Sequence, residues 1–107
     1  MVARGDIVWA DLGAPAGRRP ICVVTRDAAI EVLTAVTCAP VTRTIRGIRS
    51  EVEVGRDEGL PESSVVNCDN LMTIPKTLLD PEPVGRLGTE RSVALDHALR
   101  YALGVRW

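Results

Sequence analysis

The sequence predicts a mainly β fold, a small barrel or strongly curved sheet, that ends in a single helix. Short apolar runs separated by Gly- and Pro-containing turns fill the first two-thirds of the chain, which is typical of small barrels. The period of the apolar residues then changes to that of a helix. A chain of 107 residues, 46% of them hydrophobic, has the size of one domain, so we expect residues 1–107 to form a single domain.

The strands are predicted from the pattern of apolar residues. Glu51–Val54 alternates charged and apolar residues, as a strand does when only one of its faces is buried. Ile21–Val24 and Val32–Val36 are more uniformly apolar, which indicates central strands. The predicted strands are Asp6–Leu12, Pro20–Arg26, Leu33–Ala39, Ser50–Val54, Ser64–Cys68, Leu71–Thr73 and Val84–Leu87.

The C-terminal segment has the spacing of an amphipathic helix, with Thr89 as its expected N-cap and Gly104 as the residue that ends it. His97 falls on the polar face, and an acid–base role for it is disfavoured because the chain has no second histidine. The apolar face, spaced i, i+3, i+4, i+7 and i+8, consists of Leu95, Ala98, Leu99, Ala102 and Leu103.

The net charge of −1 argues against a protein that coats nucleic acid non-specifically, because such proteins are usually basic. The charge is nevertheless uneven. Arginines outnumber acidic residues between Arg4 and Arg49, whereas acidic residues gather at Glu51–Glu62 and Asp80–Glu82. We therefore expect a local basic face, which suits a nuclease better than a scaffold protein.

The cysteines Cys22, Cys38 and Cys68 lie in apolar runs and are expected to be buried free thiols in a reducing compartment. The chain has no CxxC pair and a single histidine, so we expect no metal site and no cofactor. Neither a signal peptide nor an apolar run of membrane-spanning length is visible. These features predict a soluble, cytoplasmic protein without membrane contact.

Two side chains are candidates for chemistry on a phosphate. Arg19 precedes Pro20, which favours an extended backbone at Arg19 and directs its side chain from the start of a strand. Its guanidinium is a planar fork of donors that can bind two phosphate oxygens. Thr42 follows the next apolar run and supplies a hydroxyl that can donate to a phosphate oxygen. Taken alone, Thr42 is better explained by the preference of threonine for strands.

The order and spacing of these segments resemble the MazF/PemK family of toxin endoribonucleases from bacterial toxin–antitoxin pairs. The resemblance runs over nearly the whole chain, and its order and spacing are more specific than any one motif. It implies an SH3-like barrel with the C-terminal helix packed against it, the MazF/CcdB-like fold. The segments that match are Arg4–Leu12, Gly17–Thr25, Ala39–Thr42, Ser64–Asn70, Thr73-Ile74 and the C-terminal helix.

The resemblance implies that Arg19 and Thr42 are catalytic and that Arg18, Arg43, Asp69 and Asn70 bind RNA. The residues themselves leave alternatives open. Arg18 and Arg43 could be solvated charges, and Asp69-Asn70 could form an Asx turn between two strands. Trp9 could stack a base, although a tryptophan on the first strand of an aliphatic barrel is more often part of the core.

The implied activity is metal-independent cleavage of single-stranded RNA (mRNA) at a short specific sequence. The 2′-OH would attack the adjacent phosphorus and leave a 2′,3′-cyclic phosphate and a 5′-OH. Because arginine stays protonated in proteins, Arg19 is expected to stabilise charge and not to transfer a proton. The resemblance also implies a homodimer and inhibition by a cognate antitoxin protein.

Two features qualify this interpretation. Family members commonly have a longer first loop, with Gly-Ser-Glu-Gln before the Arg-Pro pair, which helps to cover the RNA. Here the loop is only Gly13–Gly17. The second feature is the C-terminal Gly104–Trp107, because CcdB-like toxins of the same fold bind gyrase through their C-terminal residues without nuclease activity. A gyrase-binding toxin is therefore the main alternative, and a catalytically silent interaction module is a third.

Overall fold

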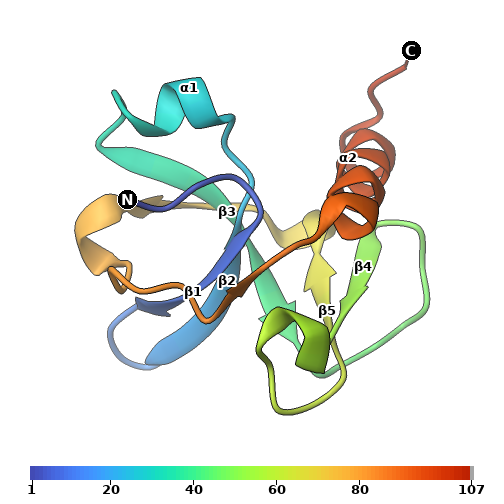
Figure 1. Ribbon diagram of the computed structural model, residues 1–107, viewed down its shortest axis with the longest axis horizontal. Coiled ribbons are helices and arrows are strands. Elements are labelled where there is room, and N and C mark those ends of the chain that lie inside the picture. The colour runs from blue at the N-terminus through green and yellow to red at the C-terminus, as the bar shows by residue number, and fades with distance from the viewer. Residues whose placement is uncertain (107) are drawn as a thin grey trace.

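The computed structural model describes residues 1–106 and shows a curled antiparallel sheet with one long helix beside it (Figure 1). Trp107, on which the gyrase-binding alternative partly depends, lies outside the described residues. The strands are β1 (Asp6–Asp11), β2 (Arg18–Val23), β3 (Ala35–Thr42), β4 (Glu51–Val54), β5 (Ser64–Asn67), β6 (Met72–Pro75) and β7 (Gly85–Arg86). The helices are α1 (Asp27–Ile30) and α2 (Thr89–Leu103), and the 3₁₀ turns are η1 (Arg56–Glu58), η2 (Cys68–Asn70) and η3 (Lys76–Leu78).

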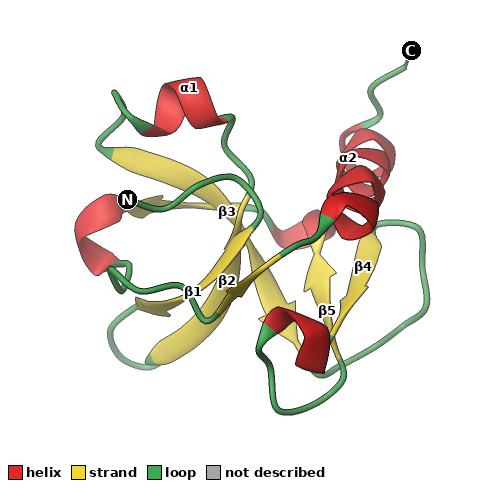
Figure 2. Ribbon diagram, in the orientation of Figure 1, coloured by secondary structure: helices red, strands yellow, loops and turns green. Residues whose placement is uncertain are grey.

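The sheet curls around β3, which runs through its centre (Figure 2). The strand order is β4-β5-β3-β2-β1-β7, and β6 branches from β3. β6 pairs with the first half of β3, Ala35–Cys38, whereas β5 pairs with its last two residues, Val41 and Thr42. Because different strands pair with the two halves of β3, the sheet forms a half-barrel with two separately packed faces.

Alternation along the central strands produces a hydrophobic core on each face of the sheet. On β1, for example, Ile7 joins one core and Val8 the other. The first core includes Ile7, Cys22, Ala39, Val41 and Val66, and α2 closes it with Leu95 and Ala98. The second includes Val8, Ile21, Val23, Ile30, Val36 and Cys38.

All three cysteines are buried free thiols, as predicted. Burial raises the pKa of Cys22 and of Cys38 to about 12, and that of Cys68 to about 11. These thiols therefore stay protonated at neutral pH and pack as small apolar side chains.

Several predicted boundaries are wrong, and pairing explains the differences. β2 begins two residues early, because Arg18 pairs with Asp11 of β1. β3 begins later than predicted and continues to Thr42, which pairs with Val65 of β5. The short helix α1 was not predicted, since its four residues are too few to show a helical period.

The predicted C-terminal helix is confirmed, but one of its ends differs from the prediction. Gly88 is the N-cap, and Thr89 is already the first helical residue. At the other end Gly104 has φ of 68° and ends the helix, as expected for a left-handed glycine. Leu103, predicted on the buried face, is 60% exposed on the last turn.

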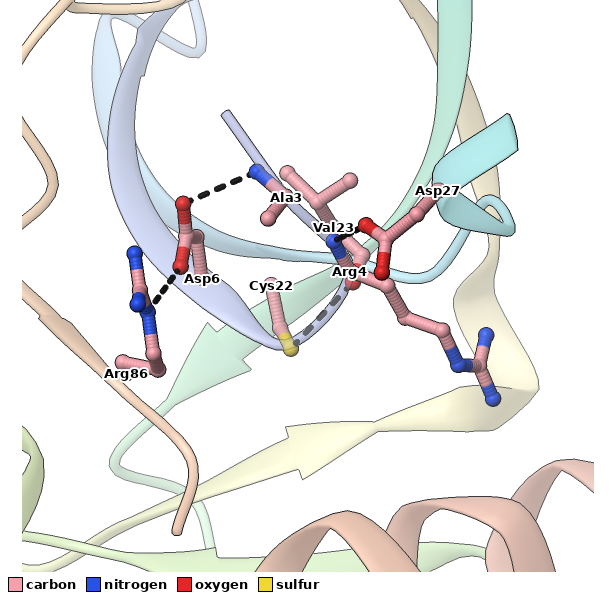
Figure 3. Close-up of polar contacts among 7 residues, drawn as sticks. All are labelled: Ala3, Arg4, Asp6, Cys22, Val23, Asp27 and Arg86. Carbon is pink, nitrogen blue, oxygen red and sulfur yellow. Dashed lines mark hydrogen bonds and ion pairs between the residues drawn. The ribbon is translucent and has the colours of Figure 1, made fainter. Parts of the chain in front are cut away.

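A buried carboxylate fixes the N-terminal segment against β1 and β7 (Figure 3). Asp6 is fully buried, and it accepts a hydrogen bond of 2.9 Å from the backbone N–H of Ala3 and one of 2.9 Å from Nε of Arg86. The backbone N–H of Arg4 donates to Oδ1 of Asp27 on α1 at 2.8 Å. With both oxygens of Asp6 bonded, its charge is compensated inside the protein, and β1 is held in the register that positions β2.

Candidate active site

The sheet register brings the two predicted catalytic residues together. β2 and β3 pair antiparallel with Ile21 opposite Pro40. The pairing ends there, and Arg19 and Thr42 each lie two residues beyond it, on the same side of the paired segment. Both residues line one hollow of about 560 Å³, at the start of β2 and the end of β3. The other lining residues include Trp9, Arg18, Arg43, Leu60, Pro61 and Glu62.

Arg19 is exposed, and within residues 1–106 its side chain makes no hydrogen bond or ion pair. Thr42 is half-buried, and its Oγ1 accepts a hydrogen bond of 3.1 Å from the backbone N–H of Thr44. Because a hydroxyl can accept and donate at the same time, this bond holds the oxygen in place and leaves its hydrogen free to donate. The pair thus offers an available cation and an oriented hydroxyl donor.

Arg18, next to Arg19 in the sequence, is in a different electrostatic state. It makes a two-pronged ion pair with Asp80, at 2.6 and 3.2 Å, and its guanidinium lies 5.9 Å from the centre of the Trp9 ring. The hydrogen bond between the two charges raises the pKa of Arg18 and lowers the pKa of Asp80. Arg18 is therefore a neutralised, oriented cation.

Arg43 is also paired, with the carboxylate of Glu62. The hydrogen bond between Arg43 and Glu62 raises the pKa of Arg43. Both side chains are more than half exposed, so solvent screens the pair and another anion can displace it easily. Of the cations that line the hollow within the described part of the chain, Arg19 alone has no acidic partner.

The structure does not bring Asp69 and Asn70 into this hollow. Both are exposed in η2, beyond the far end of β5 from the residues that pair with Thr42. Oδ2 of Asp69 accepts a hydrogen bond of 2.5 Å from the hydroxyl of Ser50, and its backbone N–H donates to Oδ1 of Asn67 at 3.0 Å. The second bond forms an Asx turn, but the side chain that accepts it belongs to Asn67 and not to Asp69 or Asn70.

The placement of Trp9 differs from the expectation that it belongs to the core. It is 37% exposed and lines the hollow beside Arg18. Its neighbours on β1, Val8 and Ala10, point to the second core, so alternation along the strand turns Trp9 to the other face, the one that carries Ile7.

Sequence reasoning also missed Asp80 and Glu62, the acidic partners of the flanking arginines. The acidic segments were visible, but nothing in the local pattern connects them with arginines so far away in the chain. His97 lies on α2, outside the hollow.

The first loop leaves the hollow open. Gly13–Gly17 closes on itself through backbone hydrogen bonds from Leu12 to Gly17, at 3.0 Å, and from Gly17 to Gly13, at 2.5 Å. None of its residues lines the hollow.

The described residues contain neither a cluster of metal ligands nor a membrane-spanning helix. Within residues 1–106, no three His, Cys, Asp or Glu side chains come close enough together to hold a metal ion. In the same range, neither helix has the length and apolar character that crossing a membrane requires.

Comparison with known proteins gives the family. Residues 3–103 match the family described as PemK-like, MazF-like toxin of type II toxin–antitoxin systems. Among curated proteins, the chain is 40% identical over 89 residues to endoribonuclease MazF3 of Mycobacterium tuberculosis, a match that covers 83% of this chain and 85% of that protein.

Solved structures of similar fold belong to the same family of toxins. The toxin MazF-mt6 of Mycobacterium tuberculosis has a TM-score of 0.86 and 38% identity, over 95% of this chain and 99% of that one. An endoribonuclease from a mycobacterial species, solved in complex with its cognate antitoxin, has a TM-score of 0.86 and 28% identity, over 100% and 99% of the two chains. The predicted MazF-like fold with a C-terminal helix is thus confirmed. The chain therefore belongs to the PemK/MazF family of toxins of type II toxin–antitoxin systems.

Proposed function

We propose that this toxin is a metal-independent endoribonuclease that cleaves single-stranded RNA at a short specific sequence, with Arg19 and Thr42 as its catalytic residues. The observation that supports this proposal most is the state of Arg19. Within the described residues of the hollow it is the cation without an acidic partner, and the same hollow is lined by the oriented hydroxyl of Thr42. Curated relatives such as MazF3 are named endoribonucleases.

In the proposed reaction the 2′-oxygen of a ribose forms a bond to the adjacent phosphorus while the bond to the 5′-oxygen breaks. The 2′-OH loses its proton, and the leaving 5′-oxygen gains one, with water available for both transfers in the open hollow. Arg19 stabilises the negative charge that develops on the phosphate oxygens, and Thr42 donates a hydrogen bond to one of them. The products are a 2′,3′-cyclic phosphate and a 5′-OH.

The flanking arginines bind the neighbouring phosphates. Arg18 and Arg43 line the same hollow as Arg19, and each can exchange its carboxylate partner for a phosphate of similar geometry. Asp69 and Asn70 are exposed and lie outside the hollow, so their role as RNA-binding residues requires RNA to extend beyond it. Reading of base edges by an acidic and an amide side chain is consistent with recognition of single strands.

The same hollow is the proposed site at which an antitoxin regulates the toxin. The mycobacterial relative was solved with its cognate antitoxin. We propose that an antitoxin inhibits this chain by placing an acidic, disordered segment on the arginines of the hollow, in competition with RNA. The toxin itself is proposed to be a two-fold homodimer, and light scattering at micromolar concentration tests this state.

The gyrase-binding alternative has no comparable support among the described residues. It depends on the C-terminal residues and assigns no role to the hollow that contains Arg19 and Thr42. A gyrase supercoiling assay separates the two functions. Inhibition of supercoiling without any cleavage of RNA would favour the alternative.

The decisive experiment is cleavage of a long single-stranded RNA by the purified chain in excess EDTA, followed by mapping of the new ends. We expect cleavage at one short sequence, 5′-OH ends that a kinase can label, and 2′,3′-cyclic phosphates. Loss of activity on chelation that Mg²⁺ or Mn²⁺ restores would refute the metal-independent mechanism.

A further inference from the structure

A second hollow, which shares no lining residue with the active site, is lined by cations and an aromatic ring. It has a volume of about 520 Å³ and lies against the C-terminal half of α2; we call it the α2 hollow. None of the described residues that line it is acidic, although the chain as a whole carries a net charge of −1. Its polar lining consists of Arg49, His97, Arg100, Tyr101 and Arg106.

Two separate parts of the chain build the α2 hollow. The left-handed Gly104 turns the chain at the end of α2, and the backbone N–H of Val105 donates to the carbonyl oxygen of Arg100 at 2.9 Å. This turn places Arg106 beside the last turn of the helix. Arg49 comes from the segment between β3 and β4, and its guanidinium lies 4.5 Å from the centre of the Tyr101 ring.

The helix dipole explains only part of this gathering of cations. Cations at a helix C-terminus are stabilised by the partial negative charge of the last carbonyl groups, which accounts for Arg100 and Arg106. Arg49 belongs to another segment, so its position over Tyr101 requires a different reason. The stacked guanidinium and the half-exposed ring, 52% accessible, form a flat surface on which a planar group can stack.

An exposed arginine-containing loop connects the α2 hollow to the active site. Every residue from Arg43 to Arg49 is exposed. Arg43 lines the active-site hollow, Arg49 lines the α2 hollow, and Arg46 lies midway between them in the sequence. The loop therefore provides a cation at each end and one in its middle, along a single exposed path.

We infer that the α2 hollow binds a segment of single-stranded RNA distant from the cleaved phosphate, with a base stacked on the Arg49–Tyr101 pair and phosphates at the arginines. This inference depends on the proposed function, because the same RNA strand occupies the active site. Stacking on aromatic rings and guanidinium planes beside cations is how proteins hold single strands without reading their sequence. An acidic peptide would use the charges, but it has no need of the stacked plane or of the arginine loop.

The test compares the binding of two labelled RNAs by fluorescence anisotropy. One is a short oligonucleotide that fills only the active-site hollow, and the other extends well beyond it. All proteins contain Arg19→Ala, so that the RNA survives the measurement. We compare this parent with Arg49→Ala and Tyr101→Ala, with Tyr101→Phe as the conservative variant, and with Arg26→Ala as the matched control for loss of an exposed arginine outside both hollows.

We expect the parent to bind the long RNA more tightly than the short one. Arg49→Ala and Tyr101→Ala should each weaken binding of the long RNA by roughly 5- to 100-fold, as for loss of one stacked base, and abolish most of the dependence on length. Tyr101→Phe should retain tight binding because it keeps the ring. Circular dichroism shows whether each variant is folded.

The inference is overturned if folded Arg49→Ala and Tyr101→Ala bind the long RNA as tightly as the parent and Arg26→Ala do. It is also overturned if the two substitutions abolish binding of a labelled Glu-rich peptide while leaving the RNA affinity unchanged, which would assign the surface to a protein partner. Failure of the proposed function has a separate signature, since the chain with Arg19 intact would then cleave no RNA.

Discussion

The active-site hollow and the α2 hollow are similar in size and in residue type, but they differ in how their charges are balanced. Each sets an arginine against an aromatic ring, Arg18 on Trp9 and Arg49 on Tyr101. In the active site, acidic side chains neutralise the flanking arginines and leave Arg19 available. In the α2 hollow, no described lining residue is acidic.

This difference indicates different uses of positive charge. Uniform attraction for phosphate lowers the free energy of the bound substrate and of the transition state equally, and such attraction does not accelerate the chemical step. In the proposed mechanism, one available cation and one oriented hydroxyl avoid strong binding of every phosphate and respond to charge that develops at one of them. The α2 hollow has no acidic side chain among its described lining residues, which suits the binding of phosphates.

The largest effect is expected from Arg19→Ala. Removing one preorganised charge-stabilising donor should lower the rate of single-turnover cleavage by about 100- to 1000-fold. Arg19→Lys should recover little, because an ammonium group cannot reproduce the planar fork. Arg26→Ala is the control for loss of a charge outside the hollow. Full activity of a folded Arg19→Ala variant would show that the available cation is not the catalytic one.

Loss of the hydroxyl should have the next largest effect. Thr42→Ala removes one hydrogen bond to a developing charge and should slow cleavage by roughly 10- to 100-fold, without weakening RNA binding to the same extent. Thr42→Ser keeps the hydroxyl and should retain partial activity. Single-turnover rates and RNA affinities of the three proteins separate these effects. Equal activity of the Ala and Ser variants would exclude a role for the hydroxyl.

A smaller effect is expected when the charge balance of the active site is altered. Asp80→Asn frees Arg18, so RNA should bind more tightly, and the slope of log affinity against log salt should steepen by about 0.7 because one more phosphate is neutralised. Tight binding of every phosphate should not raise the rate of the chemical step. An unchanged salt dependence would show that Arg18 binds no phosphate even when it is released from Asp80.

The same pair predicts a dependence on pH. The hydrogen bond from Arg18 lowers the pKa of Asp80. The ion pair therefore contributes its full share of stability at pH values above the ordinary pKa of a carboxyl group, and this stability is lost as the pH falls through the lowered pKa. A carboxyl titration by NMR should give a pKa for Asp80 below 3.8, which returns towards 3.8 in Arg18→Ala. An unchanged pKa in that variant would contradict the pairing in solution.

The smallest effect on RNA cleavage is expected from chemical modification of the cysteines. No cysteine lines either hollow, and pKa values of about 11 to 12 keep the buried thiols protonated. Iodoacetamide at pH 8 should leave RNA cleavage unchanged and should modify the thiols only after unfolding. Rapid modification of the native protein would show that the core opens.

Alkaline pH should affect stability instead. Between about pH 9 and 11 the unfolded chain loses thiol protons that the native chain retains, so the free energy of unfolding should fall, by at most about 1.4 kcal/mol per pH unit for each thiol. Urea unfolding at several pH values measures this slope. A free energy of unfolding that stays constant over this range would contradict the raised pKa values.

Local patterns in the sequence were enough to predict the mainly β fold, the C-terminal helix and Arg19 as the leading site residue. Strand alternation, helical spacing and the effect of Pro20 on Arg19 all act over a few residues, so they can be read without knowing the path of the chain. The proposed joint role of Arg19 and Thr42 rests on the resemblance to a known family. The structure adds that both residues line one hollow.

The sequence by itself thus determined the elements and the side chains available for chemistry. Only the tertiary structure decided which charges remain available, because Asp80 reaches Arg18, and Glu62 reaches Arg43, through the path of the chain and not through sequence spacing. It also placed Asp69 outside the hollow and Trp9 at its edge. The physical reason is that the strength of an ion pair depends on distance in space and on solvent exposure, neither of which a local pattern contains.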